Sequence, residues 1–234
     1  MTSKPARITG VSVIHDTLSI PAVGVVLNAD IAVPESARGV VLFAHGSGSS
    51  RHSVRNRSVA GELQRAGLAT VLADLLTPDE ERVDARTGRL RFDISLLATR
   101  VIALTDGVAH RDETARLPTG LFGASTGAAA ALVAAAERPG IIAAVVSRGG
   151  RPDLAGEYLR MVRQPTLLIV GGLDDIVIDL NRQAMTQLAG ETRLEIVPGA
   201  THLFEEPGTL RQVANLARDW FIRHLGRVPP DKLA

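Results

Sequence analysis

The chain has 234 residues, of which 45% are hydrophobic and 22% charged, and this balance excludes a wholly disordered chain, a collagen-like fibre and a coiled coil. Lys and Arg total 26 against 25 Asp and Glu, a formal net charge of +1 that gives no excess of positive charge for nucleic acid or an anionic membrane. The chain contains no cysteine, which excludes disulfides, thiolate metal ligands and a cysteine nucleophile.

The start of the chain and its apolar stretches are relevant to its place in the cell. Residues 1–7 are not followed by an apolar run of the kind that a signal peptide needs. The most apolar stretches, residues 128–136 and 141–146, are much shorter than the ~20 residues that span a bilayer. We therefore expect a cytoplasmic protein with no membrane span.

The first forty residues are predicted to form strands. Residues 8–14 alternate loosely between apolar and polar, and residues 23–33 are rich in Val and Ile. No helical pattern lies between them, so an antiparallel hairpin or meander is expected. The sequence Pro34-Glu35-Ser36 then signals a turn.

From Gly39 onward, apolar strands alternate with helices. Residues 40–44 form a continuous apolar run, which is typical of a strand buried on both faces. Strand–helix alternation indicates parallel pairing through right-handed crossovers. We therefore expect one α/β domain over residues 1–234, with an open, mostly parallel sheet, helices on both faces and antiparallel strands at the N-terminal edge. Further strands are predicted at 68–73, 118–122, 141–146, 166–170 and 194–197, helices at 54–66, 92–110, 125–138, 153–162, 179–188 and 209–225, and a polar loop at 77–91.

The carboxyl ends of the parallel strands are where such a sheet holds its site, and one of them carries a serine motif. The strand that ends at Phe122 is followed by Gly123-Ala-Ser125-Thr-Gly127, which is G-x-S-x-G between a strand and a helix. Small residues two before and two after the serine let the backbone turn tightly and lift the hydroxyl out of the sheet. We predict Ser125 to be a nucleophile; the alternative is a helix start whose small residues serve packing alone.

A nucleophilic serine needs a base, and His202 is the candidate among six histidines. It follows the last predicted strand and precedes the last helix, at the same edge of the sheet as Ser125. It also lies C-terminal to the serine, in the chain order Ser, Asp or Glu, His that this architecture uses. His202 is therefore the predicted general base, whereas His224 falls within the last helix and is expected to face solvent.

The imidazole needs a carboxylate to fix its tautomer, and two adjacent aspartates follow the strand at 166–170. Asp174 and Asp175 both qualify by location, but neighbouring residues in a turn point in different directions. Analogy with the pattern G-x-x-D-x-x-V favours Asp174, and Asp175 is then expected to cap a helix. Asp74, at the end of an earlier strand, is interpreted as structural.

Acyl transfer also needs donors for the oxyanion of the tetrahedral intermediate. The backbone N–H of Thr126, directly after the serine, is the first predicted donor. The second comes from the loop His45-Gly46-Ser47-Gly48, where Ser47 N–H is favoured and Gly46 is the nearest competitor. The ring of His45 is expected to hold this loop in place and not to take part in the reaction.

Taken together, the segments H-G at 45–46, G-A-S-T-G at 123–127, G-G-L-D-D at 171–175 and G-A-T-H at 199–202 resemble the α/β-hydrolase superfamily. The absence of a lid domain and the sequence H-G-S-G-S-S-R-H-S are similar to the dienelactone hydrolase-like group. Dienelactone hydrolase itself uses a cysteine nucleophile, whereas this chain has Ser125 and no cysteine. The resemblance therefore implies a serine carboxylesterase that acts on a small-molecule ester without a metal or organic cofactor.

Two charged segments flank the predicted site. The run from Arg51 to Arg57 follows the oxyanion loop; it is either a solvated loop and first helical turn or a place where one Arg, or Arg148, binds a substrate carboxylate or braces the loop. The run is short and lacks interleaved aromatic residues, so nucleic-acid binding is not expected. The long connection at 77–93 is expected to cover one side of the pocket, and without a lid domain small or accessible esters are favoured.

Other functions remain compatible with the same residues. A thioesterase, amidase, lactonase or perhydrolase would use the same three side chains, and sequence does not separate these reactions. A non-catalytic binding protein of this fold is a further alternative, although such proteins usually lose a member of the triad. The sequence makes no prediction of the oligomeric state.

Overall fold

The computed structural model describes residues 6–8 and 11–226 of the chain. Within these residues the strands form a nine-stranded sheet in the order β1-β2-β3-β5-β4-β6-β7-β8-β9. Strands β1, β2, β3 and β5 pair antiparallel, and every pair from β5–β4 to β8–β9 is parallel. The predicted open, mostly parallel sheet with an antiparallel N-terminal edge is confirmed. The strands are β1 (Ala6–Ile8), β2 (Val11–Ala22), β3 (Val25–Pro34), β4 (Val40–Ala44), β5 (Ala69–Ala73), β6 (Thr119–Ala124), β7 (Ile142–Arg148), β8 (Thr166–Gly171) and β9 (Thr192–Val197).

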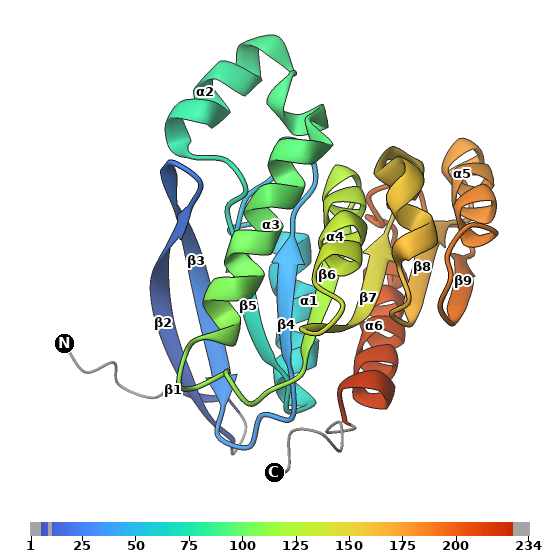
Figure 1. The fold of residues 1–234 in the computed structure, drawn as a ribbon. Coiled ribbons are helices and arrows are strands. Elements are labelled where there is room, and N and C mark those ends of the chain that lie inside the picture. Colours follow the sequence, from blue (N-terminus) through green and yellow to red (C-terminus); the bar gives the residue numbers. More distant parts are fainter. Residues whose placement is uncertain (1–5, 9–10, 227–234) are drawn as a thin grey trace.

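Helices cover both faces of the sheet (Figure 1). Helices α3 and α4 lie on one face, and α1 and α6 lie on the other, as expected from the strand–helix alternation. The helices are α1 (Val54–Arg65), α2 (Pro78–Thr87), α3 (Ile94–Ala109), α4 (Thr126–Glu137), α5 (Asp175–Met185) and α6 (Thr209–Leu225), with 3₁₀ segments η1 (Leu90–Phe92) and η2 (Pro152–Met161).

Strand β4 shows how the sheet builds two cores at once. Successive side chains of a strand point to opposite faces, so Val40, Leu42 and Ala44 pack toward α3 and α4. Val41 and Phe43 pack toward α1 and α6. All five are buried, which explains the continuous apolar run that predicted this strand.

Helix α4 is central because its side chains are small. Every residue from Thr126 to Ala136 is buried. Alanine side chains let the helix lie close to β6 and β7 while α3 and η2 pack on its outer side. The helix that follows Ser125 is therefore fixed on all sides, and so is the turn that enters it.

The largest departure from the sequence-based expectation is at residues 77–91, which were predicted to be a loop and instead contain α2 and η1. Thr77 accepts a hydrogen bond from Glu80 N–H, and the Glu80 side chain accepts from Thr77 N–H, which is a complete capping box. Gly88 ends the helix in the left-handed conformation, with φ 64°. The prediction was wrong because this helix is polar and has almost no apolar face.

Three other boundaries differ. The predicted helix at 153–162 is η2, a 3₁₀ segment interrupted at Gly156 (φ 54°). The predicted helix at 179–188 begins four residues earlier, at Asp175. The predicted strand at 8–14 includes residues 9 and 10, which lie outside the described part; β2 itself begins at Val11.

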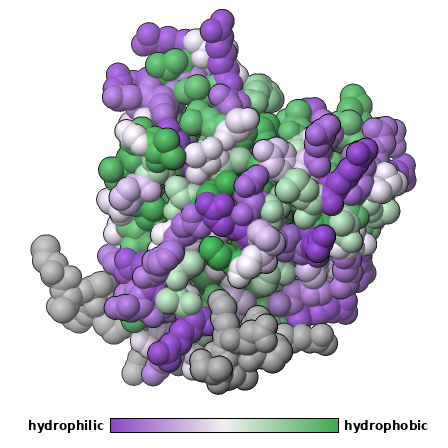
Figure 2. Space-filling model, in the orientation of Figure 1, coloured by the Kyte–Doolittle hydropathy of each residue, from purple (hydrophilic) through white to green (hydrophobic). Residues whose placement is uncertain are grey.

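Helix α2 stands beyond the carboxyl ends of the strands (Figure 1). The projection that it forms is largely hydrophilic on the face shown in Figure 2. The same edge of the sheet carries the ends of β4, β6, β7 and β8, where Ala44 pairs with Gly123, and Ala124 pairs with Arg148. The loops that leave these strands, with α2 beside them, form the site.

Candidate active site

The turn between β6 and α4 holds Ser125 in a strained conformation. Its φ of 51° and ψ of −121° lie in a region that L residues rarely adopt. Neighbouring backbone fixes this conformation, because Ser125 N–H donates to Arg148 O over 3.3 Å and Ser125 O accepts from Arg151 N–H over 3.1 Å. The serine is thus presented at the end of the sheet by a rigid turn.

The two glycines of the motif are required by close backbone approach. A Cβ on Gly123 would lie 2.4 Å from the Cα of Ala128, and a Cβ on Gly127 would lie 2.3 Å from the carbonyl oxygen of Ala44. Neither distance is possible without moving backbone. The structure thus gives the reason why small residues stand two before and two after Ser125.

Asp174 and His202 come together at the ends of β8 and β9. His202 Nδ1 lies 2.6 Å from Asp174 Oδ2. The two loops are joined by backbone, since Leu173 N–H donates to Ala200 O over 2.9 Å, and a Cβ on Gly171 would lie 2.5 Å from that same oxygen. Asp175 is exposed and is the first residue of α5, so the structure pairs Asp174, not Asp175, with the imidazole.

The ring of His202 lies over the loop that follows β7. A Cβ on Gly149 would be 3.5 Å from His202 Cε1 and 3.1 Å from the His202 carbonyl oxygen. Gly149 follows Arg148, whose carbonyl binds Ser125 N–H, so the imidazole and the serine flank the same two residues. Within the described part of the chain, no hydrogen bond joins the Ser125 hydroxyl to His202.

The loop after β4 lies against the start of α4. Ser47 Oγ and Thr126 Oγ1 are 3.2 Å apart. A Cβ on Gly46 would lie 2.9 Å from Ser125 Cβ, so the loop passes directly beside the serine. The two residues predicted to supply oxyanion donors are thus neighbours beside Ser125.

His45 holds this loop by both ring nitrogens. Leu75 N–H donates to His45 Nε2 over 3.0 Å, and His45 Nδ1 donates to the Gly46 carbonyl over 2.9 Å. This arrangement requires a neutral imidazole with its proton on Nδ1. Burial lowers the pKa of His45, against the opposing effects of the Gly46 carbonyl and the charge of Asp74, and so maintains that form.

The basic run after the loop is largely engaged in ion pairs. Asp74 accepts from Arg51 N–H over 2.8 Å and also pairs with the Arg51 guanidinium, which makes it structural, as interpreted from sequence. Asp30 pairs with Arg51 at 3.4 Å and with Arg57 at 2.9 Å. These two arginines therefore brace the loop.

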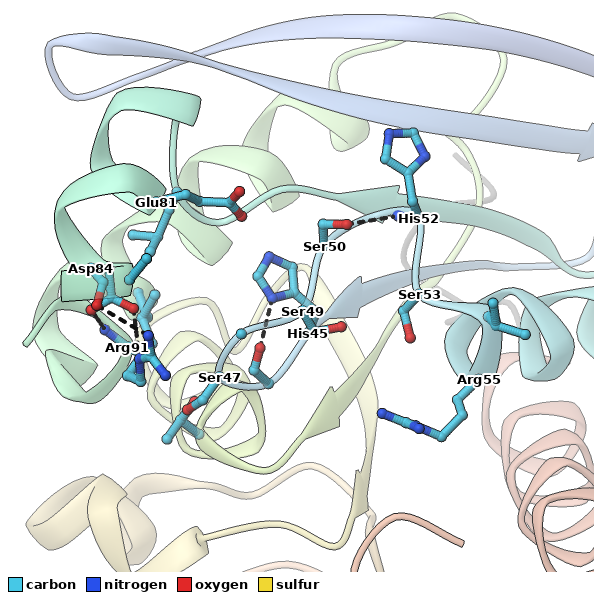
Figure 3. A pocket seen from close by; sticks show the side chains of 17 residues that line it. His45, Ser47, Ser49, Ser50, His52, Ser53, Arg55, Glu81, Asp84 and Arg91 are labelled. Carbon is cyan, nitrogen blue, oxygen red and sulfur yellow. Dashed lines mark hydrogen bonds and ion pairs between the residues drawn. The ribbon is translucent and has the colours of Figure 1, made fainter. Parts of the chain in front are cut away.

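A cavity of about 550 Å³ opens between this loop, the start of α1 and helix α2 (Figure 3). Ser47 and Thr126 line it on the side of the catalytic candidates. On the α2 side stands the ion pair of Asp84 with Arg91, whose Oδ2 and Nε are 2.7 Å apart. Burial in this wall raises the pKa of the Glu81 carboxyl, and the charge of Asp74 adds to the effect. Residues 77–93 thus form one wall of the cavity, as predicted, although they do so as a helix and a 3₁₀ segment and not as a loop.

Residues 6–8 and 11–226 contain neither a membrane span nor a metal-binding cluster. No helix there has the length and apolar composition needed to cross a bilayer. Over the same residues, no cluster of three or more His, Cys, Asp or Glu side chains is placed to hold a metal ion.

Comparison with known proteins identifies the family of this chain. The model of the dienelactone hydrolase family matches residues 27–223. A solved dienelactone hydrolase from Anabaena variabilis ATCC 29413 is 56% identical, with a TM-score of 0.89 over 91% of this chain and 99% of that chain. Est1E from Butyrivibrio proteoclasticus is 17% identical, with a TM-score of 0.75 over 90% of this chain and 99% of that one, and shows the shared fold alone.

A curated relative carries a different name. "Putative phosphoribosyl transferase Rv0571c" of Mycobacterium tuberculosis (strain ATCC 25618 / H37Rv) is 62% identical over 195 residues. The match covers 83% of this chain but 43% of that protein, so the chain spans less than half the length of this relative.

Proposed function

This chain belongs to the dienelactone hydrolase family, and we propose that it is a serine hydrolase that cleaves carboxylic esters through an acyl-enzyme. Ser125 is the proposed nucleophile, His202 the general base and acid, and Asp174 the carboxylate that orients His202. The observation that carries the proposal is the 2.6 Å contact between His202 and Asp174, beside a serine held in a strained strand-to-helix turn.

The first half of the reaction follows from the protonation of His202. A carboxylate oxygen only accepts, so Nδ1 of His202 carries a proton, and in the neutral imidazole Nε2 then has a lone pair that can accept another. Nε2 takes the proton of the Ser125 hydroxyl as Oγ bonds to the ester carbonyl carbon. The tetrahedral intermediate then breaks its bond to the alcohol oxygen, which leaves with the proton from Nε2. In free enzymes the serine–histidine hydrogen bond is often long and tightens in the substrate complex.

The second half uses the same groups with water. Nε2 removes a proton from water as the water oxygen bonds to the acyl carbon, and the Ser125 oxygen leaves and recovers that proton. The acid is released and the enzyme returns to its starting state. No electrons are exchanged, and water is the only co-reactant.

Two backbone amides are proposed to bind the oxyanion. Thr126 is the first residue of α4, so its N–H has no acceptor within the helix and lies at the positive end of the helix dipole. Ser47 N–H has no hydrogen-bond acceptor among the described residues. Donors of this kind contribute roughly 10²–10³-fold to turnover in other acyl-transfer enzymes.

The name of the mycobacterial relative, a phosphoribosyl transferase, does not change the hydrolase proposal for this chain. The chain spans 43% of that protein, and the dienelactone hydrolase family model matches residues 27–223 of this chain. Ester specificity is preferred to thioester, amide, lactone or peroxide chemistry, which the same triad would also support.

The test is covalent labelling combined with turnover. A fluorophosphonate probe should label the wild type at Ser125, and Ser125→Ala should show neither labelling nor turnover of p-nitrophenyl acetate, with its thermal unfolding retained. Labelling that persists in Ser125→Ala, or near-wild-type turnover by that variant, would refute the assignment.

A further inference from the structure

Strand β9 ends the sheet on one side and has one edge without a neighbouring strand. It is the last strand in the sheet order, and within the described part of the chain it pairs with β8 alone. Figure 1 shows it at the end of the sheet away from β2 and β3. All six of its residues, Thr192–Val197, pair with β8 in one unbroken register. A regular edge of this kind presents a row of backbone N–H and C=O groups to another strand.

The backbone groups that point out of the sheet belong to alternate residues of β9. Just before the strand, the carbonyl of Glu191 accepts from the N–H of Thr166, the first residue of β8, over 2.8 Å. The direction of the backbone groups alternates along a strand, so the next residue turns its groups to the other side. The N–H and C=O groups of Thr192, Leu194 and Ile196 therefore point away from β8.

The face of β9 on the side of α6 carries two opposite charges. Arg193 and Glu195 are two residues apart, so their side chains lie on the same face of the strand, where they form an ion pair with each other. Edge strands that are protected against pairing contain Pro, a bulge or an isolated charge such as Lys. Strand β9 contains no Pro, keeps a regular register and carries charges of both signs. A partner strand with the complementary charges can therefore neutralise both.

We propose that β9 pairs with β9 of a second copy of this chain, antiparallel and around a two-fold axis at Leu194. The outward-pointing groups of Leu194 then bind those of the partner's Leu194. Those of Thr192 bind the partner's Ile196, and the symmetric pair forms at the other end of the strand. This pairing makes about six backbone hydrogen bonds and joins the two sheets into one continuous sheet.

The charges select this register from the neighbouring ones. With the axis at Leu194, Arg193 lies directly opposite the partner's Glu195, and Glu195 lies opposite the partner's Arg193. These are the positions without backbone hydrogen bonds, where opposite side chains come closest. An axis at Arg193 or at Glu195 would set like charges against each other, and an axis midway between two residues would set outward-pointing backbone groups against inward-pointing ones. Strand β9 is therefore complementary to itself in one register.

The surface beside β9 adds apolar area to this interface. Helix α5 packs on β8 and β9, and the two-fold axis brings α5 of both copies to the same side of the joined sheet. Ile176 and Met185 of this helix are exposed, and so is Ile196 of β9. A pairing of six residues is small compared with a standard interface of roughly 1,600 Å². We therefore expect a dimer that exchanges with the monomer at micromolar concentrations.

Sedimentation velocity between about 1 µM and about 500 µM protein measures this equilibrium. The wild type should change from monomer to dimer as its concentration rises. Arg193→Glu and Glu195→Arg each replace two favourable pairs by two like-charge pairs, so each should raise the dimer Kd by about tenfold or more. Arg65→Glu reverses an exposed charge on α1, away from β9, and should keep the wild-type Kd. A wild type that stays monomeric over the whole range, or a Kd that changes less than about twofold in both β9 variants, overturns the proposal.

A mixture of the two variants tests the register. In Arg193→Glu both charged positions of β9 are acidic, and in Glu195→Arg both are basic. Each variant alone sets like charges against each other, whereas the mixture sets acidic positions against basic ones. The mixture should therefore form a heterodimer with a Kd close to that of the wild-type dimer. A mixture that associates no more tightly than either variant alone overturns the proposal.

Hydrogen exchange of the wild type tests the same pairing without any substitution. The amides of Thr192, Leu194 and Ile196 should exchange more slowly at high protein concentration than at low concentration, because the partner strand protects them. The amides of α1 should exchange equally at both concentrations. Exchange in β9 that does not depend on concentration overturns the proposal, even if a charge variant fails to fold. The dimer is independent of the hydrolase assignment, since β9 does not line the cavity, and turnover of p-nitrophenyl acetate should be the same in the wild type and in both variants.

Discussion

His202 Nδ1 donates a hydrogen bond of 2.6 Å to Asp174 Oδ2, across 28 residues of sequence. The bond fixes which ring nitrogen carries the proton and therefore which one can accept the proton of a nucleophile. The adjacent carboxylate of Asp175 is exposed and takes no part in it. The hydrogen bond therefore gives Asp174 a role that Asp175, with the same side chain, does not have.

Asp174→Asn is expected to lower kcat for p-nitrophenyl acetate by roughly 10³–10⁴-fold, because an amide can hold the imidazole in the wrong tautomer. Asp175→Asn is the matched control and should remain within about twofold of the wild type, since its side chain is exposed. Thermal unfolding of both variants shows whether the fold is retained. Equal losses in the two variants would contradict the assignment of Asp174.

Ser125→Gly is expected to be more stable than Ser125→Ala, although both lack the nucleophile. Release of a strained φ of 51° is worth roughly 1–3 kcal/mol, whereas the greater freedom of glycine in the unfolded chain costs roughly 0.5–1 kcal/mol. Urea unfolding monitored by circular dichroism measures the difference directly. A glycine variant less stable than the alanine variant would show that the turn stores little strain.

His45 is expected to make stability depend on pH. Because burial holds its pKa in the folded state below that of the free side chain, the unfolded chain binds more protons in the interval between the two values. The stabilisation is complete above pH ~6.5 and is lost as the pH falls from there through the lower pKa of the folded state. Protonation puts a hydrogen on Nε2, which then no longer accepts the Leu75 N–H.

The measurement is the melting temperature of the wild type and of His45→Gln between pH 5 and pH 8. The wild type should be the more stable at pH 8, and the difference should shrink as the pH falls. A difference that stays constant over this range would mean that His45 does not change protonation between the folded and unfolded states.

Gly127→Ala is expected to destabilise the fold by roughly 1–3 kcal/mol or more, because its Cβ would lie 2.3 Å from the Ala44 carbonyl oxygen. Gly140→Ala is the control, since a Cβ there meets no atom within 4 Å, and it should change stability by less than about 0.5 kcal/mol. Chemical denaturation of the two variants tests the comparison. Similar stabilities would mean that β4 and α4 can separate without cost.

The parts of the fold that could be predicted from sequence are those with local signals. The apolar run of β4 reflects burial of the strand on both faces. The glycines around Ser125 reflect backbone that passes too close for a Cβ atom. Helix α2 was missed for the opposite reason: its Thr77–Glu80 capping box is a local signal, but it lacks the apolar face that periodicity detects. A search for capping boxes in polar segments would have found it.

The contacts between different loops of the site could not be predicted from the sequence, because they depend on which strands and loops become neighbours. That Ser125 N–H binds the carbonyl of Arg148 depends on which strand lies next to β6, and that Arg148 has no carboxylate partner among the described residues depends on every loop around it. The sequence placed Arg148 at a strand end and left its role open. Only the packing of the loops decides which charged side chains have a partner and which have none.

Helix α2 forms one wall of the cavity but contributes nothing to the sheet. Its Glu80 pairs with the buried Arg100 of α3 at 2.8 Å, which ties the helix to the body of the domain, and its Asp84 pairs with Arg91 of the neighbouring segment η1. Changes within residues 77–93 that keep Glu80 as the partner of Arg100 are therefore expected to reshape this wall of the cavity and to leave the strands before Ser125, Asp174 and His202 in place. Within a single gene, the choice of molecule and the means of cleaving it can evolve on separate stretches of chain.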